Sequence, residues 1–99
     1  VWYPGSHSPE QKQLALRQMK GISGLFSVVL KNKSPEAMER FCNDLKYFRL
    51  AVSWGGHESL ALPYVLWNES KNSGMVRLSI GLESAEMLIS DLEKALKQV

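Results

Sequence analysis

The chain has 99 residues and a net charge of +2, with 44% hydrophobic and 22% charged residues. This composition indicates a single globular domain over residues 1–99 and excludes a disordered chain. The charge is too small to indicate a nucleic-acid or membrane-surface binder, and no apolar run approaches the roughly 20 residues of a membrane span. The start of the chain also lacks the basic and apolar regions of a signal peptide.

Cysteine and histidine give no support to a metal site. Cys42 is the only cysteine, which excludes an internal disulfide and a cysteine-based zinc site. His7 and His57 lie far apart in the sequence, and no histidine–carboxylate spacing resembles a metal site. Cys42 falls on the apolar stripe of a predicted helix, so we expect a buried structural thiol. A single free cysteine is consistent with a cytoplasmic protein.

The first half of the chain predicts two helix–strand pairs. The motifs S-P-E-Q at residues 8–11 and S-P-E at 34–36 are helix starts, because serine accepts a backbone N–H and proline suits the first helical position. The first helix runs to Met19 or Lys20, and a strand follows at residues 25–31. The second helix has an apolar stripe at spacings of three and four, made of Met38, Phe41, Cys42 and Leu45.

The second half predicts two further strands and a last helix. Residues 49–54 read as a strand that ends in a Gly-Gly turn, and residues 57–74 as a loop with a short helical turn. Residues 76–81 are the clearest strand, because apolar and polar side chains alternate strictly. Ser84 caps the last helix, whose buried side is formed by Leu88, Leu92, Ala95, Leu96 and Val99. These elements predict an α+β fold, a two-layer sandwich in which helices cover one face of a small, mostly antiparallel sheet.

Arg77 is the first candidate for a functional role. Strand alternation places it opposite Val76, Leu78 and Ile80, so it points toward solvent or a partner if helices cover the apolar face. A guanidinium group can hold a carboxylate through two parallel hydrogen bonds. A solvated strand arginine is the alternative interpretation, since exposed arginines are common.

The S-W-G-G-H-E-S segment at residues 53–59 is the second candidate. Two glycines at a strand end let the backbone approach a ligand closely, and Ser53 could donate or accept a hydrogen bond there. The alternative is a simple turn after a strand. Trp54, Tyr64 and Trp67 fit either a core or a surface that another domain or subunit covers.

Three motifs resemble the Cys/Met metabolism family of pyridoxal-phosphate (PLP)-dependent enzymes. They are S-W-G-G-H-E-S-L at residues 53–60, followed by Pro63, then V-R-L-S-I-G-L-E at 76–83 and L-I-S-D-L-E-K-A-L at 88–96. The resemblance covers nearly the whole chain and departs most at residues 64–72, whose role it leaves open. It implies the C-terminal domain of a fold-type I PLP enzyme acting on sulfur amino acids, in the manner of cystathionine β-lyase or methionine γ-lyase.

The resemblance also implies site residues. Arg77 occupies the place of the arginine that holds the α-carboxylate of the amino-acid substrate, and Ser53 the place of a serine beside that carboxylate. Trp54 resembles the tryptophan of cystathionine β-lyases. Val52 is apolar, as in methionine γ-lyases, where many cystathionine γ-lyases carry an acid. These two positions favour a β-lyase or a lyase for apolar substrates.

The residues that bind PLP in this family belong to a preceding large domain. No lysine here lies in the S-x-T-K setting of the Schiff-base lysine, so the chain alone is expected to be inactive and to bind no cofactor. The resemblance implies a tetrameric parent enzyme, with that large domain and the amino acid as partners. A stand-alone α+β binding or interaction module remains the alternative function.

Overall fold

The computed structural model describes residues 1–5, 8–64 and 74–99. These residues form three helices and a four-stranded sheet. In chain order the elements are α1 (Pro9–Gln18), β1 (Leu25–Val29), α2 (Pro35–Asp44), β2 (Arg49–Leu50), β3 (Leu60–Pro63), β4 (Met75–Ser79) and α3 (Ala85–Leu96). In this described part, no helix is long and apolar enough to cross a membrane.

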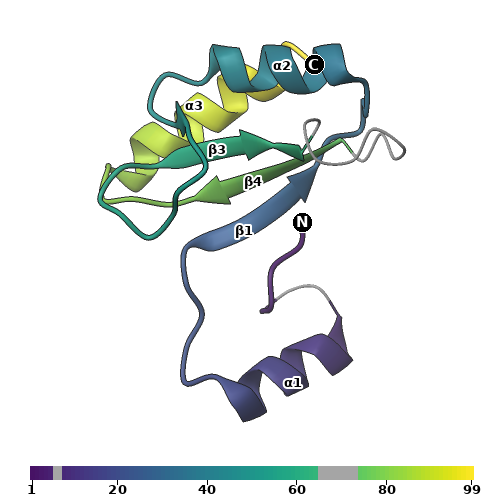
Figure 1. The fold of residues 1–99 in the computed structure, drawn as a ribbon, viewed down its shortest axis with the longest axis vertical. Coiled ribbons are helices and arrows are strands. Elements are labelled where there is room, and N and C mark those ends of the chain that lie inside the picture. The colour runs from purple at the N-terminus through teal and green to yellow at the C-terminus, as the bar shows by residue number, and fades with distance from the viewer. Residues whose placement is uncertain (6–7, 65–73) are drawn as a thin grey trace.

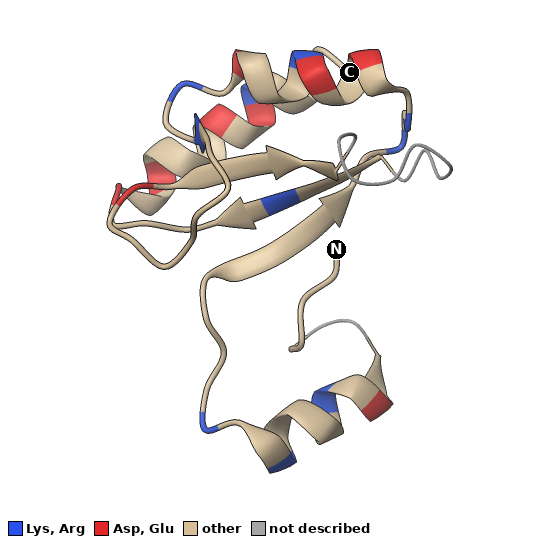
Figure 2. Ribbon diagram, viewed as in Figure 1, with Lys and Arg blue, Asp and Glu red and all other residues tan. Residues whose placement is uncertain are grey.

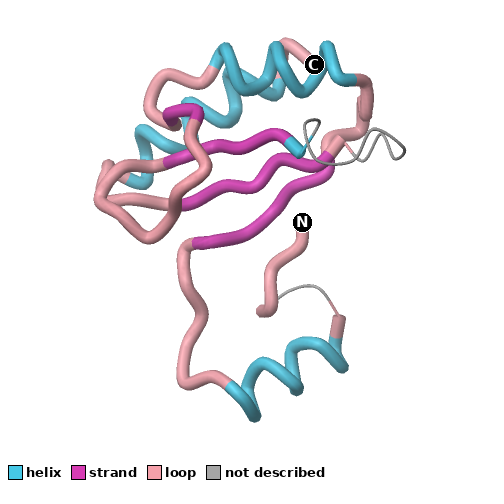
Figure 3. Tube along the Cα trace, viewed as in Figure 1, coloured by secondary structure: helices cyan, strands magenta, loops and turns pink. Residues whose placement is uncertain are grey.

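The sheet has the strand order β1-β4-β3-β2. β4 is an interior strand that pairs antiparallel with both β1 and β3, whereas β2 pairs with β3 in parallel. Helices α2 and α3 lie side by side over one face of this sheet (Figure 1). The predicted α+β architecture is therefore confirmed. Helix α1 departs from the prediction of helices on one face, because it stands apart from the sheet and its two covering helices (Figure 3).

The core lies between the sheet and the helices α2 and α3. Met38 and Phe41 of the predicted helical stripe are each 1% exposed, and Val76 and Leu78 of β4 face them at 0% and 1%. Cys42 is also buried in this core, as predicted, and burial raises the pKa of its thiol to about 11. A thiol with this pKa stays protonated at neutral pH and packs as a small hydrophobe.

Two of the three predicted serine caps form. The Oγ atom of Ser8 accepts a hydrogen bond from the N–H of Gln11 at 3.2 Å, and the Oγ atom of Ser34 accepts one from the N–H of Ala37 at 3.2 Å. Ser84 stands at the N-cap position of α3, but its side chain makes no capping hydrogen bond. The predicted start of the helix is therefore confirmed, but the predicted capping hydrogen bond from Ser84 is wrong.

Helix α3 buries a narrower face than predicted. Leu88 and Ala95 are buried, and Leu92 and Val99 are partly buried against the core. Leu96, however, is 50% exposed. The stripe that reaches the core is narrow because Asp91 occupies part of it and is itself only 3% exposed.

Two strand predictions were wrong. The strand predicted at residues 49–54 is only Arg49–Leu50, because the chain then leaves the sheet edge and folds over β4. The loop predicted at 57–74 contains a strand, Leu60–Pro63. Leu60, Ala61 and Leu62 are all buried, so this interior strand is apolar on both faces and lacks the alternation that marks a half-buried strand.

A buried carboxylate fixes the connection between α2 and β2. Asp91 of α3 accepts hydrogen bonds from the backbone N–H of Lys46 at 2.9 and 3.0 Å and from that of Tyr47 at 2.9 Å. Backbone groups in a connection have no ladder partner, so a carboxylate that accepts from two of them replaces the missing acceptors. This contact holds the connection that leads into β2 against α3.

We expect replacement of Asp91 by asparagine to lower the free energy of unfolding by about 1–3 kcal/mol, because one carboxylate oxygen becomes an NH₂ group facing backbone donors. Urea denaturation measures this change. The matched control is Asp44→Asn at the end of α2, where the carboxylate is exposed. Equal stabilities for the two variants would contradict the role assigned to Asp91.

Candidate functional site

The polar face of β4 carries the candidate site. Arg77 and Ser79 leave the strand opposite Val76 and Leu78, so they point away from α2 and α3. The loop of residues 51–59 crosses this face (Figure 1). It leaves Arg77 half-buried and Ser79 only 3% exposed. In the described part of the chain, the loop backbone covers Arg77 and no helix does.

The structure brings the four predicted site residues together. The Nη2 group of Arg77 donates hydrogen bonds to the carbonyl oxygen of Val52 and, at 3.1 Å, to that of Ser53. The Cζ atom of Arg77 lies 5.3 Å from the centre of the Trp54 ring, a cation–π distance. The side chains of Val52 and Trp54 are 58% and 59% exposed. Together the four residues form a surface site with one cation and two exposed apolar groups.

Arg77 retains donors for a ligand. Its hydrogen bonds to described residues all come from Nη2, which leaves N–H groups on Nη1 and Nε. Within the described part of the chain, no acidic side chain lies within ion-pair distance of it, and the ion pair found there joins Arg49 to Glu58. Figure 2 shows the basic position in the middle of β4, with acidic residues on the helices and at the loop end. A guanidinium group that lacks an internal counter-charge suits an incoming carboxylate.

The far end of the loop is held by a second set of contacts. Ser59 is completely buried, and its Oγ atom accepts from the N–H of Gly81 at 2.8 Å and donates to Oε2 of Glu83 at 2.7 Å. The N–H of Ser59 donates to Oε1 of Glu83 at 2.8 Å. Between these ends, Gly55 donates to the Oγ atom of Ser79 at 3.2 Å. The loop is thus attached at both ends to β4 and to the residues that follow it.

The hydrogen bonds to Glu83 also keep it charged. They come first from the backbone N–H and then from the hydroxyl of Ser59, and they lower the pKa of the carboxyl group below its ordinary value of 4.5. Burial opposes this shift, and the nearby His57 adds to it. Glu83 is therefore an anion across the neutral range, and a charge-assisted acceptor for Ser59.

The glycines of the site have different roles. A Cβ on Gly81 would lie 2.3 Å from the carbonyl oxygen of His57 and 2.6 Å from the carbonyl carbon of Glu58, so glycine is needed for the close approach of loop and strand. Gly55 has φ +77°, which the turn requires. A Cβ on Gly56 would meet nothing within 4 Å. The close approach between loop and strand is thus at Gly81, whereas the approach of a ligand to residues 55–56 stays a prediction.

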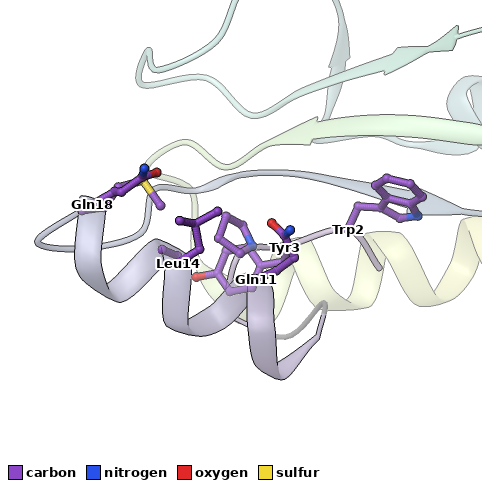
Figure 4. A pocket seen from close by; sticks show the side chains of 8 residues that line it. Trp2, Tyr3, Gln11, Leu14 and Gln18 are labelled. Carbon is purple, nitrogen blue, oxygen red and sulfur yellow. The ribbon is translucent and has the colours of Figure 1, made fainter.

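Other candidate residues lie outside this site. Trp67, His7 and all of residues 65–73 fall outside the described residues, and Tyr64 is partly buried at the end of β3. A pocket of about 310 Å³ lies between the N-terminal segment and α1, where Trp2, Tyr3, Gln11, Leu14 and Gln18 are among its lining residues (Figure 4). It contains none of the four candidate residues. Among the described residues, no group of three or more His, Cys, Asp or Glu side chains could hold a metal ion.

Sequence reasoning gave no role to three polar residues that hold the loop, namely Ser59, Ser79 and Glu83. Ser59 ends the candidate segment at residues 53–59, and Ser79 and Glu83 lie in the 76–83 motif that contains Arg77. The available signal was the alternation of β4, because Ser79 shares a face with Arg77 and must therefore face whatever Arg77 faces.

Comparison with known proteins decides the family. The model of the Cys/Met metabolism PLP-dependent enzymes matches residues 1–97. The chain belongs to this family. The predicted family is therefore confirmed, along with its link to PLP and to cysteine and methionine metabolism.

Members of the family include close relatives of this chain. The chain is 41% identical to cystathionine gamma-lyase of Mus musculus over 108 aligned residues, which covers 98% of the chain and 27% of the relative. It is 36% identical to cystathionine beta-lyase of Lactococcus lactis subsp. cremoris over 109 residues, covering 99% and 28%. The chain thus spans about a quarter of the length of the relatives that it matches.

Solved structures agree with the fold. The crystal structure of cystathionine gamma synthase from Xanthomonas oryzae pv. oryzae in complex with cystathionine matches with a TM-score of 0.83 and 36% identity. The match covers 97% of this chain and 27% of the other. The fold is accordingly that of a segment of the family's trans-sulfuration enzymes.

We expect Gly81→Ala to destabilise the protein by about 1–3 kcal/mol or to displace the loop, because the added methyl group overlaps backbone atoms that cannot move independently. The matched control is Gly56→Ala in the same loop, where the methyl group meets open space and the change in unfolding free energy stays within about 0.5 kcal/mol. Chemical denaturation of both variants tests this. Similar stabilities would show that the close approach at Gly81 is unimportant.

Proposed function

We propose that residues 1–99 are the C-terminal, substrate-side domain of a PLP-dependent enzyme that cleaves carbon–sulfur bonds in sulfur amino acids. One observation carries the proposal. Arg77 has donors left for a ligand, no acidic partner in the described part of the chain, and a position beside the exposed Val52 and Trp54 side chains. Family membership favours this function over a stand-alone interaction module.

The proposed role of Arg77 is to bind and orient the substrate. In this role its guanidinium group binds the α-carboxylate through hydrogen bonds, and the exposed Val52 and Trp54 contact the substrate side chain. Holding the carboxylate at a fixed point determines which bond at Cα is aligned for cleavage. When bound, PLP supplies an electron sink that stabilises negative charge at the Cα atom. Proton transfer needs a lysine that we assign to the preceding part of the full-length enzyme.

The residues of this chain fit the substrate and not the cofactor. The site offers one guanidinium group and loop carbonyl groups, but no lysine in an S-x-T-K setting. PLP itself therefore belongs, in this proposal, to the part of the enzyme that lies outside the chain. This division agrees with the chain's share of about a quarter of its relatives' length.

The choice between β- and γ-elimination remains a prediction. The relatives of the chain include both a gamma-lyase and a beta-lyase. Trp54 and Val52 favour a β-lyase by resemblance. The Trp54 ring lies beside the guanidinium group of Arg77, and the exposed Val52 contacts that group through its carbonyl oxygen. Comparing turnover of β- and γ-substituted amino acids by the full-length enzyme would test the preference.

In the full-length enzyme, we expect Arg77→Ala to lower kcat/KM for L-cystathionine by about 10²–10³-fold, because a charged hydrogen-bond partner of the substrate is lost. Arg77→Lys should recover only part of this, since an ammonium group lacks the planar fork. Arg40→Ala is the matched control, because Arg40 is exposed on α2 across the sheet. An unchanged kcat/KM for Arg77→Ala would remove the proposal.

The isolated 99-residue chain should not bind PLP stoichiometrically. Titration of the chain with PLP should give no absorbance band of protein-bound cofactor, whereas the full-length enzyme gives one. A stoichiometric band on the isolated chain would contradict the assignment of the cofactor site to another part of the enzyme.

A further inference from the structure

We propose that Glu83 is a positioning residue, which acts through Ser59 to hold the 51–59 loop where that loop orients Arg77 toward the substrate. The inference rests on the proposed function, because it deepens the role of the same site. Glu83 itself makes no hydrogen bond or ion pair with any of the four candidate residues. Its effect has to pass through the loop.

Glu83 and Ser59 are joined by two hydrogen bonds. Both carboxylate oxygens are used, one by the backbone N–H of Ser59 at 2.8 Å and one by its hydroxyl at 2.7 Å. The hydroxyl hydrogen is committed to Glu83, because the Oγ atom accepts from the N–H of Gly81 at 2.8 Å. Ser59 is completely buried, so its N–H and hydroxyl donors are shielded from water and depend on the carboxylate of Glu83. Two bonds to one carboxylate fix position as well as distance.

This contact closes the end of the β3–β4 ladder. Ser59 immediately precedes β3 and Glu83 follows β4, and the last pair of the ladder joins Leu60 to Ser79. The ladder continues outward as a hydrogen bond from the N–H of Leu82 to the carbonyl oxygen of His57 at 2.8 Å. The second half of the loop is thereby attached to the chain that leaves β4.

Further hydrogen bonds attach the loop to β4 and the residues after it, from Ser59 back toward the part of the loop that contacts Arg77. Gly55, His57 and Ser59 each bond to β4 or to the residues after it, so every second residue of this half of the loop is held. Residues 52 and 53 come next, and their carbonyl groups orient the guanidinium group of Arg77. Release of the loop at Ser59 would free these carbonyl groups to shift, and the guanidinium group would lose its fixed direction.

Loss of the Glu83 carboxylate should leave the fold intact. Glu83 is only half-buried and lies outside the hydrophobic core, which is on the opposite face of the sheet. In Glu83→Gln the amide oxygen can still accept from the N–H of Ser59. The amide NH₂ group cannot accept the serine hydroxyl hydrogen, so one of the two bonds is lost. The variant therefore loosens the loop without opening a cavity.

The test uses steady-state kinetics of the full-length enzyme with L-cystathionine as the substrate probe. Because Arg77 holds the carboxylate in both the ground state and the transition state, loosening it should act mainly on KM, with a smaller effect on kcat through the alignment at Cα. We expect Glu83→Gln to raise KM about 5- to 50-fold with kcat changed less than 3-fold and with unchanged PLP content. The matched control is Glu93→Gln on the exposed side of α3, which should change neither constant.

A double-variant comparison separates positioning from simple stability. In an Arg77→Ala background, Glu83→Gln should change kcat/KM less than 2-fold, because the group that it positions is absent. Equal effects in both backgrounds, or a loss of kcat that follows the folded fraction with KM unchanged, would overturn the inference. If Glu83→Gln does not fold, Ser59→Ala removes the hydroxyl that donates to Glu83 and keeps the hydrogen bond from the backbone N–H, and an unchanged KM there overturns the inference too.

The two proposals fail in different ways. If Arg77→Ala leaves kcat/KM unchanged, the proposed function is wrong whatever Glu83→Gln does. If Arg77→Ala lowers kcat/KM strongly but Glu83→Gln leaves KM at its wild-type value, the carboxylate role of Arg77 stands and the positioning role of Glu83 is wrong.

Discussion

The arrangement of the site depends on the hydrogen bonds by which polar side chains of β4 and the segment after it hold a crossing loop. Arg77 and Ser79 supply partners for backbone groups of the loop on one side, and Glu83 does so at its far end. A loop that leaves a sheet edge loses its ladder partners, and a buried unpaired backbone group is unfavourable. The polar side chains of β4 and of the segment after it replace the hydrogen-bond partners that the loop backbone has lost. The same hydrogen bonds that satisfy the loop also orient the guanidinium group.

The two faces of β4 therefore have separate functions. Its apolar face, with Val76 and Leu78, packs against α2 and α3 and contributes most to stability through buried area. Among the described residues, no helix packs on its polar face, which the 51–59 loop crosses (Figure 1). Changes on one face need not disturb the other, because the strand backbone between them is paired on both sides.

Local signals in the sequence predict most of the fold. Serine and proline before an apolar stripe mark the starts of α1 and α2, and strict alternation marks β4. The same signals fail for β3, because Leu60, Ala61 and Leu62 are buried on both faces and do not alternate. They also extend β2 too far, since residues 52 and 53 alternate like a strand but give their carbonyl groups to Arg77. Contacts between distant segments determine both where β3 forms and where β2 ends. The periodicity of a single segment carries no information about such contacts.

The interior place of β4 has a consequence for how substrate choice could change. Hydrogen-bonded neighbours on both edges fix the Cα of Arg77, so the anchor that we propose for a carboxyl group is hard to move. Val52 and Trp54 sit on a connection outside any strand, where side chains can be exchanged without breaking a ladder. Under the proposed function, discrimination between sulfur amino acids could thus evolve by replacing one or two exposed side chains, while recognition of the carboxyl group common to all amino acids stays in the rigid part of the scaffold.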